Sequence, residues 1–439
     1  MSISIVSLVR YESPLTSVRK AVDLCNGLDM LPSNPRVFIK PNIPFYARSV
    51  RFPKWGVITT SRVIEDMVTL LKERGVDDIT IGEGTVLLDP KDKETAPQAF
   101  EQLGYNVLKK RYGVKSISIY DRPFQRVNVG EGVELNFNSD ILESDFVVNI
   151  PVLKTHAQTV VSLGIKNIKG MIDVPSRKKC HNADPKRNLH FMVSKLANRL
   201  PPTFTLIDGI YSTEQGPGFD GKIRRSNILI ASRDILSADM VGAKILGYEP
   251  EEVPYLVHAA ADRGRPLDLS DVEVKGEKIE DLSSRHEYSF QYNQDETLPI
   301  KMAQMGIKGL SYPKYDLTMC TYCSVLNGVI LASLAMAWKG EPWDNVEVLT
   351  GKAMRPTPGK KTILLGNCLW KALKDHPDID NMIAVKTCPP SQPQIVKALH
   401  QAGIDINPAP LEHIDQVPAF FMRRYEGKPE FDEALFTIA

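Results

Sequence analysis

The sequence contains no long hydrophobic run and no excess of charge of either sign. Its longest apolar run, residues 329–338, is interrupted by Ser333, whereas a membrane-spanning helix needs ~20 apolar residues. The 54 Lys and Arg residues and the 53 Asp and Glu residues leave a formal net charge of +1. Nucleic-acid binding and polybasic membrane binding both need a clear positive excess. Neither nucleic acid nor a membrane is therefore an expected partner.

Cysteine is also scarce, with six residues in a chain of 439. This number is too small for a disulfide scaffold at this length. The N-terminal sequence MSISIVSLVRYE has no basic leader followed by a long apolar segment, so no export signal is predicted. These absences predict a cytoplasmic globular protein. At ~150 residues per domain, the length predicts two or three domains.

Short apolar runs alternate with helical patterns in residues 1–290. The apolar runs show little alternation, which is typical of strands covered on both faces. We therefore predict an α/β domain at residues 1–290, with a largely parallel sheet and flanking helices. The glycine-containing segment 211–221 is predicted to be a loop that can close over a ligand. Strands are predicted at residues 37–39, 78–81, 146–150, 204–207 and 228–231, and helices at 61–74, 95–103 and 235–246.

Residues 291–439 show a second, smaller α/β pattern, so a domain boundary is placed near residue 290. Three of the predicted strands run into a segment that carries a cysteine, at Cys320, Cys368 and Cys388. The second domain is therefore predicted to bear a cysteine site. Its strands are predicted at residues 315–319, 345–349, 362–365 and 382–385, and its helices at 324–338 and 392–401.

Four cysteines of the second domain are the strongest chemical signal. Cys320 and Cys323 form a C-x-x-C pair, and Cys368 and Cys388 follow at wide spacing. The carboxyl ends of parallel strands line one edge of a sheet, where ligands collect, so we expect the four thiolates to converge as metal ligands. A [4Fe–4S] cluster is the expected cofactor, because structural zinc usually uses two close cysteine pairs and only one is present here.

Other interpretations of the cysteines stay open at this point. Four thiolates also suit a [2Fe–2S] cluster or tetrahedral zinc. No metal would be needed if these cysteines were buried apolar residues or a thioredoxin-like redox pair. Cys25 closes a helix-like run and is assigned to the core. Cys180 lies in a strongly basic segment and is predicted to be at the surface or to line a pocket.

Polar side chains follow the predicted strands of the first domain. Lys40 and Asn42 end one strand, and Lys154 and His156 come shortly after another, so both pairs are expected at the ligand edge of the sheet. Lysine cations and amide donors can hold a carboxylate or a phosphate, and an imidazole can act as a general acid or base. Alternatively, Lys154 and His156 only cap strand ends. We predict His156 and Lys154 as catalytic residues, and as substrate-binding residues Lys40, Asn42, Lys166, Asn167 and Lys169.

Several short motifs occur in an order that resembles the domain of unknown function 362 family, over about residues 5–265. The segments GNC at 366–368 and CPP at 388–390 are similar to a cysteine-bearing tail found with this family, while the C-x-x-C-x-x-C run of a bacterial ferredoxin domain is lacking. The resemblance implies an iron–sulfur protein typical of anaerobic metabolism and leaves the substrate open. The motifs include KPN at 40–42, GEG at 82–84, VLKTH at 152–156, GIKNIKG at 164–170 and SAD at 237–239.

Three functions are compatible with these features. The first is a cytoplasmic iron–sulfur oxidoreductase, in which a cluster at residues 291–439 exchanges electrons with a small anionic substrate bound by residues 1–290. The second is a non-catalytic electron carrier or an activator of another redox enzyme. The third is a non-redox acid–base enzyme of the racemase or dehydratase type, in which the cluster is structural. A redox partner protein and a symmetric homodimer are further expectations.

Overall fold

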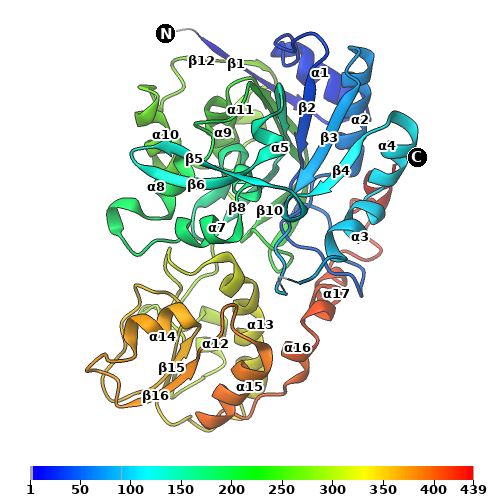
Figure 1. Ribbon diagram of the computed structural model, residues 1–439. Coiled ribbons are helices and arrows are strands. Elements are labelled where there is room, and N and C mark those ends of the chain that lie inside the picture. The colour runs from blue at the N-terminus through cyan, green and yellow to red at the C-terminus, as the bar shows by residue number, and fades with distance from the viewer. Residues whose placement is uncertain (1–2, 90, 439) are drawn as a thin grey trace. The chain divides into compact units, whose positions relative to one another are not determined.

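Two sheets, each containing parallel strands, organise the structure, a computed structural model that describes residues 3–89 and 91–438 (Figure 1). The chain divides into two units. Unit 1 comprises the residues up to Arg177, then His190–Ser289, and the segment from Phe421 onward. Unit 2 comprises Lys178–Leu189 and Phe290–Phe420.

The division differs in two places from the predicted domains 1–290 and 291–439. The passage from Ser289 to Phe290 falls at the predicted boundary. However, residues 178–189 belong to unit 2, and the tail after residue 420 belongs to unit 1. A segment that lies between elements of unit 1 in the sequence therefore supplies side chains to unit 2.

The C-terminal tail belongs to unit 1 because its aromatic side chains pack there. The ring centroid of Phe431 lies 4.5 Å from that of Tyr425 and 5.4 Å from that of Trp55. The Ile223 amide donates a hydrogen bond of 3.1 Å to the Tyr425 hydroxyl. The Tyr211 hydroxyl donates one of 3.0 Å to the carbonyl of Glu430. The composition of the tail alone gives no indication of these distant partners.

The apolar runs of unit 1 form a ten-stranded sheet with the order β12-β1-β11-β10-β7-β2-β3-β4, and β8 pairs with β10 and β9. β7, β2, β3 and β4 run parallel to their neighbours in this order, whereas β11 is antiparallel to β1 and β10. The predicted α/β fold with a largely parallel sheet is confirmed. The strands are β1 (Ser4–Arg10), β2 (Arg36–Lys40), β3 (Asp78–Glu83), β4 (Lys115–Ser118), β7 (Phe146–Asn149), β8 (Val152–His156), β9 (Val160–Ser162), β10 (Thr203–Glu214), β11 (Lys222–Ser232) and β12 (Val272–Gly276).

Helices flank this sheet, as the periodicity predicts. The helix predicted at 61–74 is α2 (Ser61–Glu73), whose apolar side chains at the helical spacing are buried. Gly75 follows its end with φ of 76°, a left-handed conformation that glycine adopts without strain. The other helices with residues in unit 1 are α1 (Thr16–Leu24), α3 (Thr95–Gln102), α4 (Tyr105–Tyr112), α5 (Ser139–Leu142), α6 (Gly164–Asn167), α7 (Val174–Cys180), α8 (Leu189–Ser194), α9 (Ile235–Ile245), α10 (Pro254–Asp262), α11 (Ile279–Leu282) and α17 (Val417–Met422).

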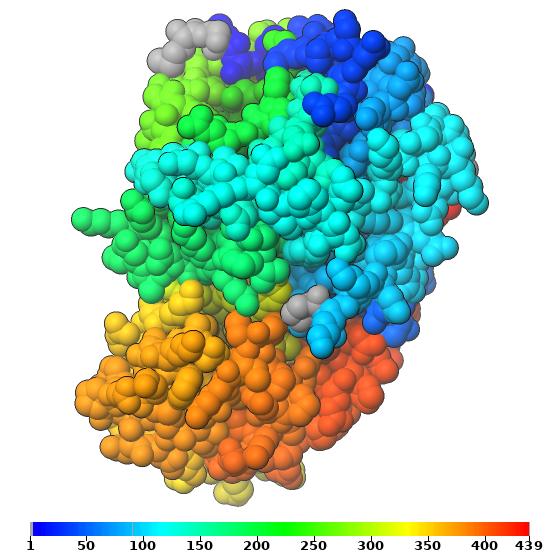
Figure 2. Space-filling model, in the orientation of Figure 1, coloured from blue at the N-terminus to red at the C-terminus, as the bar shows by residue number. Residues whose placement is uncertain are grey.

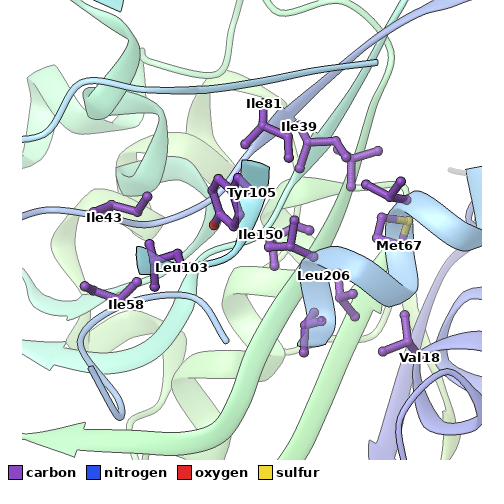
Figure 3. Close-up of a cluster of buried hydrophobic side chains, with 14 of the residues drawn as sticks. Val18, Ile39, Ile43, Ile58, Met67, Ile81, Leu103, Tyr105, Ile150 and Leu206 are labelled. Atoms are coloured by element: carbon purple, nitrogen blue, oxygen red, sulfur yellow. The ribbon is translucent and has the colours of Figure 1, made fainter. Parts of the chain in front are cut away.

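The main hydrophobic core of unit 1 lies between the sheet and its helices. Ile39 of β2, Ile81 of β3 and Leu206 of β10 are fully buried. They belong to one cluster with Met67 of α2 (Figure 3). This core fixes the strands whose carboxyl ends carry the polar residues described below.

A separate antiparallel hairpin, β5 (Phe124–Gly130) with β6 (Val133–Asn138), belongs to unit 1. A bridge between Phe137 and Ile172 connects it to the segment before α7. Figure 2 shows this part of the chain, in cyan, at the surface of the unit.

The predicted loop at 211–221 is wrong over its first four residues. β10 continues to Glu214 and pairs with β11 from Tyr211 opposite Arg225 to Glu214 opposite Lys222. The connection between the two strands therefore occupies only residues 215–221. The glycines and the proline in this segment predict the turn correctly, but they do not show where the backbone pairing ends.

Unit 2 contains a parallel sheet with the order β13-β14-β15-β16. The predicted strand at 315–319 is wrong, because these residues form a loop and β13 lies earlier. In this loop Asp316 accepts a hydrogen bond of 2.7 Å from the Thr318 amide, which is typical of a turn. The elements are β13 (Leu310–Ser311), β14 (Val346–Leu349), β15 (Lys361–Leu365), β16 (Asn381–Val385), α12 (Ile300–Gln304), α13 (Thr321–Ala337), α14 (Asn367–Leu373), α15 (Gln392–Gln401) and α16 (Ala409–Glu412).

No helix within residues 3–89 and 91–438 is both long enough and apolar enough to span a bilayer. The apolar segment noted in the sequence belongs to α13, which has 17 residues. Its buried side chains include Leu326, Val329 and Ile330. They pack within unit 2.

Truncating a core side chain should test the packing of the sheet. Leu206→Ala is expected to lower the free energy of unfolding by about 3–5 kcal/mol, because it removes buried apolar surface and leaves a cavity. Val257→Ala, at a position on α10 that is 37% exposed, should change it by about 0.5 kcal/mol or less. Urea unfolding followed by circular dichroism measures both. Equal effects of the two substitutions would contradict the assignment of Leu206 to the core.

Candidate functional site

Polar side chains gather at the carboxyl ends of the parallel strands of unit 1. Lys40 is the last residue of β2, Glu83 is the last of β3, and Asn149 is the last of β7. Lys40 lies opposite Asn149 in the strand register. Because these strands run parallel, their ends lie at one edge of the sheet, the usual place for a ligand. We call Lys40, Asn42, Glu83, Asn149, Lys154 and Asn167 the lysine site.

A buried ion pair lies at the centre of the lysine site. The Lys40 ammonium donates to Glu83 Oε2 at 2.8 Å and to the Pro41 carbonyl at 2.6 Å, and both charged side chains are almost completely buried. Burial lowers the pKa of Lys40, and the Glu83 carboxylate opposes this shift. Glu83 also accepts from the amides of Ile43 and Gly84, each at 2.7 Å. The pair therefore connects the ends of β2 and β3 and the loops that follow them.

A chain of three asparagines extends from this ion pair. Asn42 Nδ2 donates to Asn167 Oδ1 at 2.9 Å, and Asn167 Nδ2 donates to Asn149 Oδ1 at 2.8 Å. Asn167 Oδ1 also accepts from Lys40 at 3.3 Å. Lys40 therefore has three acceptors for the three donor hydrogens of its ammonium. This arrangement gives Lys40 a positioning role.

Lys154 is bound differently from Lys40. Its Nζ donates to Asn42 Oδ1 at 2.5 Å and to the Val57 carbonyl at 3.0 Å. Burial lowers the pKa of Lys154 to about 7, the nearby cation of Lys40 lowers it as well, and Glu83 raises it in part. A neutral amine has two donor hydrogens and one lone pair. Two acceptors therefore suit the neutral form of Lys154 and leave its lone pair able to accept a proton.

Two further lysines lie near Lys154. Lys166 is partly exposed, and its pKa is lowered well below the usual value by burial and by the charges of Lys169 and Lys154. The proximity of these three amines disfavours holding a proton on all of them at once. A bound anion would favour their protonated forms, because its charge offsets theirs. The structure therefore brings Lys154, Lys166 and Lys169 close together.

His156 is the last residue of β8 and is partly exposed. Its Nδ1 accepts a hydrogen bond of 3.1 Å from the Gln158 amide. In the neutral ring the proton is then on Nε2. Alternate residues of a strand point to the same side, so His156 and Lys154 share one side of β8. The pair combines a proton donor at Nε2 of His156 with a proton acceptor at Lys154.

A buried aspartate positions α6, which carries Lys166 and Asn167. Asp239 Oδ1 accepts from the Gly164 amide at 2.6 Å, and Oδ2 accepts from the Ile165 amide at 2.9 Å. Burial raises the pKa of Asp239 to about 7. A Cβ at Gly164 would lie 2.7 Å from Asp239 Oδ1. The glycine is therefore needed for the close approach of the carboxylate to the backbone.

Several of these residues were not predicted from the sequence. Glu83 belongs to the GEG motif but is not among the predicted site residues, and Asn149 is predicted only as part of a strand. Arg177 is buried and donates to the carbonyls of Gly84 and Gly170, each at 2.7 Å, so the GEG segment is packed against protein. A polar residue at the very end of an apolar run, as at Glu83 and Asn149, is the signal that could have identified them.

The four candidate ligands of unit 2 lie close to helix starts and strand ends. Cys320 is the N-cap of α13, and Cys323 lies in its first turn. Cys368 lies in the first turn of α14, directly after β15. Cys388 follows β16 by three residues. Cys368 and Cys388 therefore lie at strand ends, whereas Cys320 follows a loop.

The four thiols influence one another. The pKa of Cys323 is raised well above its usual value by a hydrogen bond with Cys320 and by burial, and the charges of Cys320, Cys368 and Cys388 add to this. Burial raises the pKa of Cys368, again with contributions from Cys320 and Cys388. A Cβ built on Gly366 would lie 3.9 Å from Cys368 Sγ and 4.0 Å from Cys323 Sγ. Both sulfurs therefore lie close to Gly366.

Within the part of the chain that the structure describes, no three His, Cys, Asp or Glu side chains are arranged to hold a single metal ion. A single zinc ion requires thiolate sulfurs about 2.3 Å from one point. An iron–sulfur cluster separates its cysteine sulfurs more widely, because irons and inorganic sulfides lie between them. The choice between an iron–sulfur cluster and a zinc ion at these cysteines therefore stays a prediction from the sequence.

Other groups around the thiols also fit a cluster. The Tyr312 side chain is fully buried, and its hydroxyl has no hydrogen-bond partner among the described residues. Burial raises the pKa of Tyr312, and the charges of Tyr292 and Cys323 add to the shift, so the hydroxyl lies near Cys323. A buried donor without an acceptor is costly, and the sulfur of a bound cluster would accept its hydrogen bond. Met319 and Leu369 next to the ligands are buried.

The remaining cysteines differ in how well they were predicted. Cys25 lies in the core, as expected, and donates to the Ala21 carbonyl at 3.3 Å. The prediction that Cys180 is a surface or pocket-lining residue is wrong, because it is fully buried. Its neighbour His181 is held in unit 2 by the Leu317 carbonyl, 2.9 Å from Nδ1. This contact fixes Cys180 and His181 within unit 2, although residues 183–187 of the same segment are exposed.

The fold and the two sites define a two-unit α/β protein with a polar site at one sheet edge and a separate group of four thiols. The model of the family described as "Domain of unknown function (DUF362)" matches residues 37–244, which include the lysine site. The predicted resemblance is therefore supported over these residues. Cys320, Cys323, Cys368 and Cys388 lie outside the match.

Two known proteins are similar to parts of the chain. The Thylakoid-associated protein sll1697 of Synechocystis sp. is 25% identical over 267 residues, which are 60% of this chain and 79% of that protein. The structure of the lactate racemase apoprotein from Thermoanaerobacterium thermosaccharolyticum matches with a TM-score of 0.34 and 13% sequence identity. That match covers 56% of this chain and 57% of the racemase chain.

The lowered pKa of Lys154 can be observed directly. In protein with 13C-labelled lysine, one side-chain resonance is expected to titrate near pH 7, and it should disappear in Lys154→Met. Lys20→Met, at an exposed position of α1, should leave it in place. NMR titration makes the comparison. If no lysine titrates below pH 9, Lys154 is not held in the environment described here.

The same shift predicts the pH dependence of stability. Between the folded pKa of about 7 and the unfolded value of about 10.4, the unfolded chain binds more protons at Lys154. The free energy of unfolding should therefore rise with pH over this window, through this group. Urea unfolding at pH 7 and pH 9.5 should show a smaller rise in Lys154→Met than in Lys20→Met.

Removing the charge of Glu83 should be costly. Glu83→Gln leaves the Lys40 ammonium buried without its counter-ion, and we expect a loss of about 3–5 kcal/mol in the free energy of unfolding. The matched control is Glu73→Gln, which breaks an exposed pair with Arg19 and should cost about 1 kcal/mol or less. Equal losses in urea unfolding would contradict a central role for the buried pair.

Proposed function

We propose that this protein is an iron–sulfur redox protein that acts on a small anionic molecule. The observation that carries the proposal is the gathering of four thiols in unit 2, from α13 and from the ends of β15 and β16. Cysteine thiolates are the usual ligands of [4Fe–4S] clusters. The start of α13, where Cys320 and Cys323 lie, favours negative charge through its helix dipole.

The residues proposed to hold the cluster are Cys320, Cys323, Cys368 and Cys388. A bound [4Fe–4S] cluster supplies one-electron transfer at a potential that its surroundings adjust. The neighbours Met319 and Leu369 are buried and give Cys320 and Cys368 an apolar surrounding. The Tyr312 hydroxyl is placed to donate a hydrogen bond near Cys323.

The lysine site is proposed to bind the substrate together with Lys166 and Lys169, which lie beside it. These two lysines are partly exposed and can pair with a carboxylate or a phosphate. Lys154, whose pKa is lowered to about 7, is proposed to accept a proton, and His156 in its protonated form is proposed to donate one. Lys40, Asn42 and Asn167 hold one another in place and fix the position of Lys154.

A second candidate function is supported by the surroundings of Lys154. An amine with a pKa of about 7 and a histidine on the same side of one strand are the groups that acid–base catalysis uses near neutral pH. A racemase- or dehydratase-type reaction on a small carboxylate would need no electron transfer. In that case the cluster would be structural.

The cellular location and the partners of the protein stay predictions from the sequence. The thylakoid association belongs to the name of the similar protein. For this chain we propose a cytoplasmic location and a role in anaerobic metabolism. We also propose that it interacts with a redox partner protein and forms a homodimer.

Metal analysis tests the proposed function. Protein purified without oxygen should contain about four irons and four acid-labile sulfides per chain, as one [4Fe–4S] cluster requires, and should give an EPR signal after reduction. Cys368→Ser should lose most of this iron, whereas Cys25→Ser, in the core of unit 1, should keep it. Stoichiometric zinc bound in place of iron, or iron content unaffected by Cys368→Ser, would refute the proposal.

The two candidate functions differ in what Cys368→Ser does to turnover. If the reaction is redox, turnover of the substrate should be lost together with the cluster. If turnover persists in a folded, iron-free Cys368→Ser protein and is lost in Lys154→Met, the acid–base function is the correct one.

A further inference from the structure

The ammonium of Lys178 contacts one of the four thiols of unit 2 and has no role in the function proposed above. Lys178 Nζ donates a hydrogen bond of 3.3 Å to Cys388 Sγ. The two residues are 210 positions apart in the sequence. Lys178 comes from the segment 178–189, which unit 2 receives from between elements of unit 1.

A second contact fixes the position of this ammonium. Lys178 Nζ lies 5.3 Å from the ring centroid of Tyr322, within the range of a cation–π interaction. Tyr322 is buried and lies on α13 between Cys320 and Cys323. The cation is therefore held between the side chain of Cys388 and the helix that carries two other candidate ligands.

Cys388 differs from the other three candidate ligands in its exposure. It is exposed, whereas Cys320 is buried and Cys323 and Cys368 are partly buried. Water screens charges that act on an exposed ligand from a distance, whereas a cation in direct hydrogen-bond contact still acts on it. Hydrogen bonds to ligand sulfurs and nearby charge are among the factors that set the potential of an iron–sulfur cluster.

We propose that Lys178 is a positioning residue that raises the reduction potential of a cluster held by the four cysteines, through its hydrogen bond and charge at Cys388. This inference rests on the proposed iron–sulfur function. One-electron reduction of the cluster adds one negative charge and breaks no bond, and the electron comes from an external reductant. A cation at 3.3 Å from a ligand sulfur stabilises the more negative, reduced state.

The test is a redox titration of the reconstituted full-length protein, with dithionite as the reductant and EPR as the readout. Lys178→Met should bind as much iron and sulfide as the unmodified protein, and its midpoint potential should shift to a more negative value. Lys178→Arg keeps the charge and should restore most of the shift. Lys186→Met is the matched control, because it removes the same charge from an exposed position of the same segment, and its potential should not change.

The outcomes separate this inference from the proposed function. If the unmodified protein binds no iron and sulfide, both fail. If Lys178→Met holds a full cluster at an unchanged potential, the inference fails and the proposed function stands. If Lys178→Met loses the cluster while Lys178→Arg keeps it, Lys178 is needed to hold the site together, and the proposed role in setting the potential is overturned.

Discussion

The ion pair between Lys40 and Glu83 is the interaction on which the arrangement of unit 1 depends. Both side chains are almost fully buried, so each charge needs the other to offset the loss of water. Glu83 also accepts from the amides of Ile43 and Gly84. The pair therefore fixes the ends of β2 and β3, the loops after them and, through Asn167, the start of the asparagine chain that holds Lys154.

The two sites differ in how their polar groups find partners. In the lysine site the asparagines and Lys40 bond to one another, and the neighbouring Lys166, Lys169 and His156 are partly exposed. In unit 2 the thiols repel one another's charge, and the buried hydroxyl of Tyr312 has no partner among the described residues. The centre of the lysine site is therefore held by its own side chains, whereas the thiols and Tyr312 of unit 2 are proposed to gain their missing interactions from a bound cluster.

Much of the fold follows from local patterns. The helix at 61–73 and the strands around residues 37–39 and 78–81 have the periodicity that the structure shows. Local patterns are misleading where distant segments pair. Residues 211–214 directly precede a glycine-rich turn but continue β10, because β11 supplies hydrogen bonds along their length. The C-terminal tail joins unit 1 through aromatic contacts with Trp55, which no local pattern can predict.

The sequence by itself determined that lysines and an asparagine end apolar strands and that four cysteines cluster in the last third of the chain. The ends of parallel strands share one edge of a sheet, whichever side chains pack around them, so these residues could be placed from the sequence. Only the tertiary structure decided that Glu83 neutralises Lys40, that Lys154 favours its neutral form, and that Lys178 contacts Cys388. These partners lie 43 to 210 positions apart, and strand register and burial, which arise only in the folded chain, select them.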